Sequence, residues 1–234
     1  VACNDLHISN VKIIGSWRYN SDGIDMHNCK NVTIDNCFIR TFDDSICVKG
    51  FDCYYSGDVE KAVHEAMYRN GKAYDIFSNA RIRNCVIWND WGRCLEIGAE
   101  TRAMEICDII FENCDIIHVT MDVLDCQNVD YADVHDLIWR NINIEYDDVI
   151  PEPLLQNTDR ETYQSGDPDF APATLCSVVT FHPEYSAGGK KRGRNRNILF
   201  ENIHLFGRQQ PIFRFEGFSD EAASENIIIR DFYH

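Results

Sequence analysis

The sequence lacks long apolar runs, and no stretch approaches the roughly 20 residues that a helix needs to cross a bilayer. It has no recognisable signal peptide and opens on Val1, without an initiator methionine, inside a strand-like pattern. Basic residues are scarce, with 22 Lys and Arg against 38 Asp and Glu and a formal net charge of −16. These absences argue against a membrane span and, because like charges repel, against nucleic acid or a polyanion as partner. The opening in mid-pattern predicts a fragment of a longer chain.

Metal-ligand spacing is missing as well. The 11 cysteines and 8 histidines form no C-x-x-C pair and no Cys/His cluster of the kind that holds zinc, so the sequence predicts no metal and no other cofactor. A disulfide scaffold would be expected in a much smaller secreted chain. At 234 residues the chain can bury one hydrophobic core, which predicts a single domain over residues 1–234.

A short pattern recurs along the chain: alternating apolar residues, an Asn, a small apolar residue, and a second alternation. Its copies are centred on Asn10, Asn36, Asn84, Asn113, Asn141, Asn202 and Asp231. Intervals of 26 to 29 residues suit one coil of a solenoid and are too short for a strand–helix–strand crossover. The pattern therefore predicts an all-β fold, a right-handed parallel β-helix. Leucine-rich repeats are the rival, but their leucine spacing is absent.

Two longer intervals, of 48 and 61 residues, predict either a coil with an insertion or two coils. The insertions would fall at about residues 51–79 and 147–174. Apolar residues within 58–69 recur at helical spacing, so a short helix is expected there. Both insertions are expected to form walls beside a binding cleft, because long insertions in a solenoid are often functional.

The residue after each Asn occupies one register of the stack. It is expected to point inward, which gives three cysteines a packing role as small buried apolar residues. The column reads Val11, Cys37, Cys85, Cys114, Ile142, Ile203 and Phe232. The Asn column itself is expected to form a side-chain ladder at a turn. A second strand begins about ten residues after each Asn, so two strands of every coil can be aligned by counting.

This alignment brings three aspartates together. Matching Ile24 with Ile46 places Asp22 over Asp44, with Asp43 one residue earlier, on strands about 4.8 Å apart. Carboxyl groups this close raise the pKa of at least one member, which keeps a proton available near neutral pH. Glycoside hydrolysis needs such a set: one carboxyl protonates the leaving oxygen and another activates water or attacks carbon. An aspartate ladder capping turns, or a calcium site, is the structural alternative.

Two segments resemble a known family. Residues 20–25 read Asn-Ser-Asp-Gly-Ile-Asp and residues 43–49 read Asp-Asp-Ser-Ile-Cys-Val-Lys. They are similar to the Asn-Thr-Asp-Gly-Ile-Asp and Asp-Asp-Cys-Ile-Ala-Ile-Lys blocks of the polygalacturonase family, glycoside hydrolase family 28. The resemblance implies an inverting hydrolase in which Asp43 is the general acid and Asp22 with Asp44 positions and deprotonates the water. Asn20 would orient this cluster.

A third segment, residues 92–98, resembles the family's Gly-His-Gly-Ile-Ser-Ile-Gly block less closely. Arg93 stands where the family has a histidine, and no Arg-Ile-Lys triplet for gripping a galacturonate carboxylate follows. With the acidic net charge, these departures argue against pectin and favour a neutral glycan or a limited exo-acting cleavage. Arg93 could still bind an acidic sugar, so both readings stay open.

Further candidates flank the aspartates. Glu96 is expected either to face substrate or to pair with an arginine, and Trp91, placed one coil above Asp43, either to stack on a sugar or to pack in a turn. Asp122 and Asp125 continue the column and are expected to be structural.

Three other classes of function remain: a polysaccharide lyase with a Ca²⁺ site and a basic residue, a non-catalytic glycan-binding module, and a glycosyl transferase. The family resemblance favours a secreted or periplasmic location, whereas many free thiols suit a reducing one. The sequence does not indicate an oligomeric state.

Overall fold

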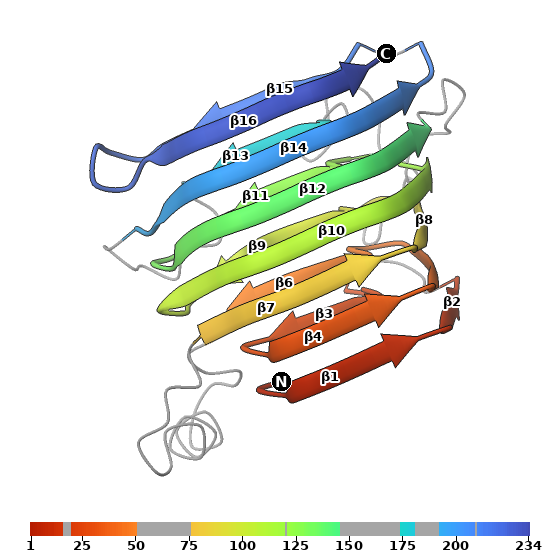
Figure 1. Cartoon of the computed structure of the whole chain (residues 1–234), viewed down its shortest axis with the longest axis horizontal. Coiled ribbons are helices and arrows are strands. Elements are labelled where there is room, and N and C mark those ends of the chain that lie inside the picture. Colours follow the sequence, from red (N-terminus) through yellow and green to blue (C-terminus); the bar gives the residue numbers. More distant parts are fainter. Residues whose placement is uncertain (16–19, 51–75, 120, 146–173, 181–191, 209) are drawn as a thin grey trace, which may run out of the picture.

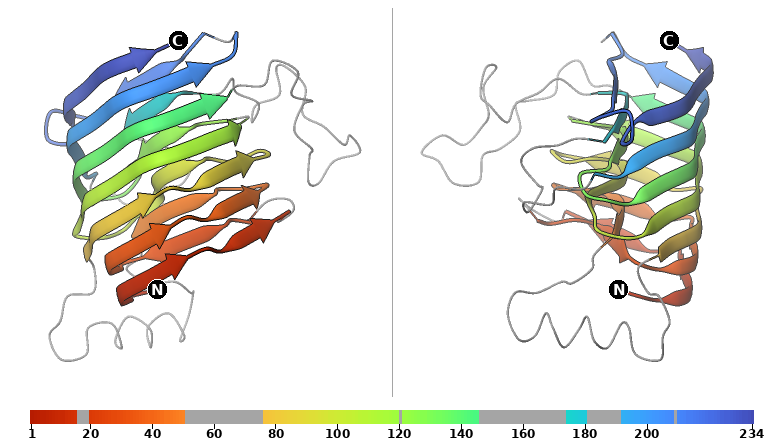
Figure 2. Two further views of the ribbon diagram at one scale, coloured as in Figure 1. Left: turned by 45° about the vertical axis from the view of Figure 1, so that its right-hand side comes forward. Right: turned by 90° about the vertical axis from the view of Figure 1, so that its left-hand side faces the viewer.

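The computed structural model describes residues 1–15, 20–50, 76–119, 121–145, 174–180, 192–208 and 210–234. These ranges contain strands and connecting turns but no helix, and the strands form coils stacked along one axis (Figures 1 and 2). No helix in them could therefore cross a membrane. The predicted helix at 58–69, and most of both predicted insertions, lie outside the described residues.

All strand pairing is parallel and falls into two sheets. The ten-stranded sheet contains β1 (Asn4–Ser9), β2 (Lys12–Ile14), β4 (Lys30–Asp35), β5 (Phe38–Thr41), β7 (Ile76–Arg83), β8 (Val86–Asn89), β10 (Glu105–His118), β12 (Asp133–Glu145), β14 (Arg194–Phe206) and β16 (Ser224–Tyr233). The six-stranded sheet contains β3 (Ile24–His27), β6 (Ile46–Gly50), β9 (Leu95–Thr101), β11 (Leu124–Gln127), β13 (Cys176–Val179) and β15 (Phe213–Glu216).

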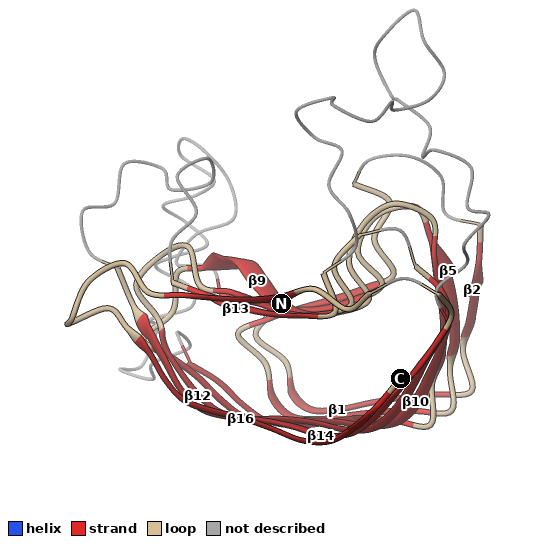
Figure 3. Cartoon of the chain, turned by 90° about the horizontal axis from the view of Figure 1, so that it is seen from above, coloured by secondary structure: helices blue, strands red, loops and turns tan. Residues whose placement is uncertain are grey.

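Seen along the stack, the ten-stranded sheet bends and forms two walls, and the six-stranded sheet closes the third (Figure 3). Each coil contributes strands to both sheets, so successive copies of the repeat lie beside one another. The predicted parallel β-helix is confirmed. The alignment by counting is confirmed for the Asn-centred copies, which pair in register: Cys114 with Ile142, and Ile142 with Ile203.

The bend in the ten-stranded sheet lies at the Asn column. All seven residues of this column have a positive φ of 53° to 56°, a conformation in which Asn and Asp are enriched. Side-chain amides link neighbouring coils: Asn36 Nδ2 donates to Asn10 Oδ1 at 2.6 Å, and Asn202 Nδ2 donates to Asn141 Oδ1 at 2.9 Å. The predicted ladder at a turn is therefore confirmed.

A second column of the same kind lies five residues before the first. Its members all have a φ of 51° to 59° and are Asp5, Asn31, Asn79, Asp108, Asp136, Asn197 and Asn226. Asn79 Nδ2 donates to Asn31 Oδ1 at 2.7 Å, and Asn226 Nδ2 donates to Asn197 Oδ1 at 2.9 Å. The sequence carried the signal, since Asn or Asp stands at each of these positions, but the repeat was defined on the later column alone.

Apolar side chains from all three walls fill the interior. Cys37, Cys85 and Cys114 are at most 2% exposed, which confirms their packing role. A stack of aromatic rings runs through successive coils, with centroid distances of 5.3 Å from Phe111 to Trp139 and 4.9 Å from Trp139 to Phe200. Because these columns fix the register of every coil, they also fix which polar residues meet on the outer face of the six-stranded sheet.

Candidate active site

The three predicted aspartates lie together where β3 and β6 begin. Ile24 pairs with Ile46, as predicted, and the Gly23 N–H donates to the Asp44 carbonyl at 2.8 Å, so Asp22 lies beside Asp44. Asp43 precedes Asp44 and accepts two backbone N–H groups, from Asn20 at 2.6 Å and from Asp44 at 3.0 Å. Asn20 thus contacts the cluster through its main chain.

Burial shifts the proton affinity of two of these carboxyl groups. The pKa of Asp43 rises to about 6, first because of burial and then because of the neighbouring Asp44 carboxylate, while the N–H group of Asn20 opposes the rise. Burial and the adjacent Asp25 raise the pKa of Asp22 to about 7, although the positive charge of Lys49 lowers it. The cluster can therefore hold protons at a pH where ordinary carboxyl groups have lost them.

Lys49 links this cluster to two further acids. Its Nζ lies 2.9 Å from Asp25 Oδ2, 3.2 Å from Asp22 Oδ2 and 3.8 Å from Glu100 Oε2. Burial lowers the pKa of Lys49, but the surrounding negative groups outweigh it and raise the pKa above its usual range. The pKa of Asp25 is lowered, because contacts with His27 and Lys49 outweigh the effect of burial.

These residues border an open cleft of about 350 Å³. Its lining consists of Asn20, Asp22, Gly23, Asp25, His27, Lys49 and Glu100. Glu100 follows Arg93 in a strand that was expected to flank the cleft, whereas the roles of Lys49 and Asp25 were not predicted. A signal for these last two existed, since strand alternation places Asp25 and His27 of β3, and Cys47 and Lys49 of β6, on one face.

Arg93 lies next to the aspartates, one coil further on. Its backbone N–H donates to Asp44 Oδ1 at 2.9 Å, and its Nη1 lies 3.8 Å from the same oxygen. Gly92 permits this approach, since a Cβ there would lie 2.6 Å from the Asp43 carbonyl carbon and from the Asp44 nitrogen. The predicted register of Trp91 is wrong by one residue: Gly92 lies beside Asp43, whereas Trp91 stacks on Phe42 with a centroid distance of 5.8 Å.

The Arg93 guanidinium is surrounded by acids from three successive coils, counting Asp44. Its Nε lies 3.1 Å from Asp125 Oδ2, 3.6 Å from Glu96 Oε1 and 3.8 Å from Asp122 Oδ2. Burial raises the pKa of Asp125 to about 7 and that of Glu96 well above its usual range. Of the two roles expected for Glu96, the structure places it against an arginine. Asp125, expected to be structural, belongs to this ion-pair network.

One group of side chains at the site has donor atoms that could hold a cation. Single donor atoms of Asp44, Cys47 and Glu96 lie within 4.8 Å of one another, and the Cys47 thiol donates to Glu96 Oε2 at 2.9 Å. All three residues are buried, and burial raises the pKa of the Cys47 thiol far above its usual range. The three residues belong to two different coils, so no short spacing motif in the sequence predicts this group.

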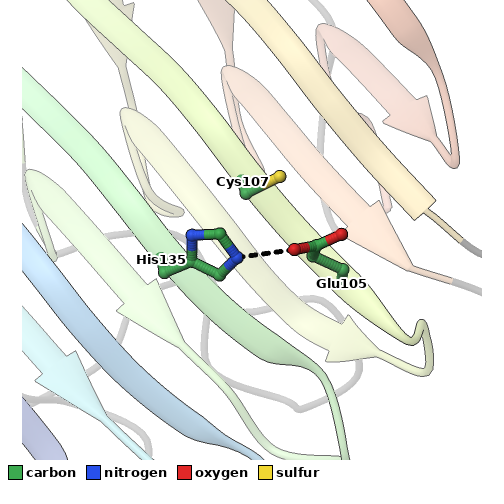
Figure 4. A group of neighbouring side chains, drawn as sticks. All are labelled: Glu105, Cys107 and His135. Atoms are coloured by element: carbon green, nitrogen blue, oxygen red, sulfur yellow. Dashed lines mark hydrogen bonds and ion pairs between the residues drawn. The ribbon is translucent and has the colours of Figure 1, made fainter.

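A second such group lies on β10 and β12 and consists of Glu105, Cys107 and His135 (Figure 4). The His135 ring is held between two carboxylates, with Nε2 2.7 Å from Glu105 Oε1 and Nδ1 2.7 Å from Asp136 Oδ2. Burial raises the pKa of the Cys107 thiol to about 12, so Cys107 is not a reactive thiolate. The two contacts of His135 account for the arrangement without an ion.

Comparisons with known proteins agree with the motifs at the start of the chain. Residues 1–57 match the family model Glycosyl hydrolases family 28, and this segment contains Asn20, Asp22, Asp43 and Asp44. The predicted resemblance is thus confirmed there, while Arg93 and Glu96 lie beyond the match. No curated protein matches the chain.

One similar solved structure is the crystal structure of a hyperthermoactive exopolygalacturonase from Thermotoga maritima. It is 16% identical to this chain with a TM-score of 0.45, and the alignment covers 97% of this chain and 47% of that one. The chain therefore spans about half the length of that protein.

Proposed function

We propose that this chain carries the catalytic site of a glycoside hydrolase that cleaves a poly- or oligosaccharide with inversion. The observation that carries the proposal is the meeting of Asp22, Asp43 and Asp44 at one end of β3 and β6, with the pKa of Asp43 raised to about 6. A carboxyl group with that pKa can hold a proton and release it near neutral pH, which general acid catalysis requires. The family resemblance of residues 1–57 supports the same class of reaction.

In the proposed reaction Asp43 gives its proton to the glycosidic oxygen while the bond from that oxygen to the anomeric carbon breaks. A water molecule attacks the carbon from the opposite face and loses a proton to a carboxylate. We assign this role to Asp44, which accepts the Arg93 N–H at 2.9 Å and lies 3.8 Å from the guanidinium, beside Asp22 and Asp43. Asp22, whose pKa is about 7, positions the water.

The geometry favours this function over a lyase reaction. A lyase needs an unprotonated basic side chain to remove a proton from carbon. Lys49 and Arg93 lie among carboxylates that raise their pKa values, so neither can act as a base near neutral pH. The third basic side chain among the described residues of the site, His27, is 3% exposed, with Nε2 3.8 Å from Asp25 Oδ2.

The first test replaces the proposed acid. Asp43→Asn should lower kcat by roughly 10²–10⁴-fold on a natural glycan, because the change removes the transferable proton and keeps the shape. The loss should be much smaller on an aryl glycoside, whose leaving group needs no protonation, and proton NMR of the first product should show the inverted anomer.

Asp115→Asn is the matched control. It is the same isosteric replacement of an aspartate, made at an exposed position on β10 away from the cleft. Near-normal turnover of a natural glycan by Asp43→Asn would contradict the proposed role, as would equal losses on both types of substrate.

A further inference from the structure

The candidate active site holds far more carboxyl groups than cations. Two cations, Lys49 and Arg93, are contacted by seven carboxyl groups, and Asp43 lies beside one of these. The seven are Asp22, Asp25 and Glu100 around Lys49, and Asp44, Glu96, Asp122 and Asp125 around Arg93. Even when the three most proton-retaining of them are neutral, negative groups outnumber the cations.

Neither cation is free to receive an anionic substrate. The side chain of Lys49 is 10% exposed and that of Arg93 is 13% exposed. A sugar carboxylate could reach either one only by displacing a protein carboxylate, which would then be left without its partner in a partly buried site. Such replacement is unfavourable, because a buried charge that loses its counter-charge keeps the cost of desolvation.

The cleft instead presents hydrogen-bond acceptors. Among the described lining residues, Lys49 is the only side chain with a permanent positive charge, while Asp22, Asp25 and Glu100 contribute carboxyl oxygens. The side chains of Asp22, Asp25 and Glu100 are 20%, 25% and 31% exposed, so their carboxyl groups can be reached from the cleft. Sugar hydroxyl groups are donors that can satisfy such oxygens without adding negative charge.

We propose that this site takes an uncharged glycan and discriminates against glycans that carry uronate or sulfate groups. The inference rests on the proposed hydrolase function and names the substrate class of that site. It also answers the question that the sequence left open, since Arg93 is held by protein carboxylates and does not serve as a receptor for an acidic sugar.

The test compares substrates that differ only in charge. Polygalacturonan and other uronate-containing glycans are each paired with their carboxyl-reduced form, which keeps the linkage and ring stereochemistry and removes the charge. Wild-type kcat/KM should be at least tenfold higher on the reduced member of every pair that is cleaved. Raising the salt concentration should narrow this difference, because salt screens repulsion between exposed charges. Equal rates on both members at low salt, or preference for the uronate, would overturn the inference.

A charge-reversal variant examines the cause. Glu100 is partly exposed at the cleft, so Glu100→Lys replaces a carboxylate with a cation there and should raise the relative rate on the uronate member about tenfold. Glu225→Lys makes the same change in net charge on β16 and should leave the ratio unchanged. An equal shift in both variants would show that the cleft charges do not set the preference.

Binding separates failure of the inference from failure of the proposed function. Affinity electrophoresis of Asp43→Asn in gels containing one member of each pair reports glycan binding without turnover. If only neutral glycans retard migration and the wild type cleaves none of the glycans, the proposed hydrolase function is contradicted while the preference for uncharged glycans is supported. If the wild type cleaves uronates and both members of each pair retard migration equally, the hydrolase function is supported and the preference for uncharged glycans is contradicted. If no glycan retards migration, the preference is contradicted as well.

Discussion

At the scale of single residues, the surroundings of the Asp22 carboxyl group disfavour its charged form. Burial and Asp25 raise its pKa from 3.8 to about 7, so the folded protein binds a proton there that the unfolded chain releases. The folded state is therefore penalised as the pH rises from about 4 through 7. Asp22→Asn removes that penalty and should stabilise the protein at pH 8 by on the order of 2 kcal/mol, after allowance for the partial exposure of the side chain.

Urea unfolding at pH 4, 6 and 8 measures this effect. The advantage of Asp22→Asn over wild type should be small at pH 4, close to the ordinary aspartate pKa of 3.8, and should grow toward pH 8. The exposed change Asp115→Asn is the control. A stability difference that stays constant with pH would show that loss of the Lys49 contact, and not the proton equilibrium, governs the variant.

Residues of the site differ in how well the sequence predicted them. Asp22, Asp43 and Asp44 were predicted to lie together because each sits a fixed number of residues before a strand whose register the repeat sets. The contacts of Arg93 were not predicted. Its long side chain reaches Asp44 just before β6, Glu96 on β9 and Asp125 on β11, and strand register does not specify where such a side chain ends. Trp91 was misplaced by one residue because the turn before β9 was counted as if it matched the turn before β6.

At the scale of the repeating element, the Asn columns hold each coil in its bend. Asn141 has a φ of 54°, donates to Asn113 Oδ1 at 2.9 Å, and accepts from Asn202 at 2.9 Å. Asn141→Ala loses both bonds and leaves alanine in the left-handed region, which costs an apolar residue about 1–2 kcal/mol and which Asn tolerates better through its polar side chain; the expected total cost is about 2–3 kcal/mol. Asn141→Gly loses the same bonds without the backbone penalty.

Denaturant unfolding of the two variants separates the contributions. The glycine variant should be destabilised by about 1 kcal/mol less than the alanine variant, with the m-value unchanged. Asn143→Ala is the control, because Asn143 is also exposed on β12 and also donates a side-chain bond to a neighbouring coil, to Asp115 Oδ1 at 2.8 Å, but lies outside both columns and has no positive φ. Equal losses for Asn141→Ala and Asn141→Gly would mean that the positive φ carries no cost and that the side-chain bonds act alone.

The same element shows what a pattern can and cannot predict. The periodic positions could be predicted from the sequence because each coil repeats the same local conformation: an Asn in the left-handed region followed by an inward-pointing apolar residue. The second column, five residues earlier, is equally periodic but less uniform in sequence, because three of its seven members are aspartate: Asp5, Asp108 and Asp136. The intervals of 48 and 61 residues left two possibilities open, a coil with an insertion or two coils. The contacts between coils at the site depend on how far side chains reach, which the repeat does not specify.

At the scale of the whole molecule, a stack of coils makes stability depend on position. Each coil contacts only its neighbours, so a terminal coil is held on one side and a central coil on two. The order of the sheet reflects this, because β1 and β16 each pair with a single strand whereas β10 and β12 lie between two long ones. Local opening should therefore start at the ends of the stack.

Ten of the cysteines are described, and all ten are free thiols spread over successive coils, which makes them reporters of this gradient. Cys37 and Cys176 lie nearer the ends of the stack, Cys94 and Cys114 lie in the middle, and all four are at most 2% exposed in the folded chain. Pulsed alkylation of the 234-residue chain in mild denaturant, read by peptide mass spectrometry, should modify Cys37 and Cys176 several-fold faster than Cys94 and Cys114. Exposed Cys3 reacts at once and calibrates the reagent. A single common rate for the four buried thiols would mean that the coils open together, and the solenoid would then unfold as one cooperative unit in spite of its linear contacts.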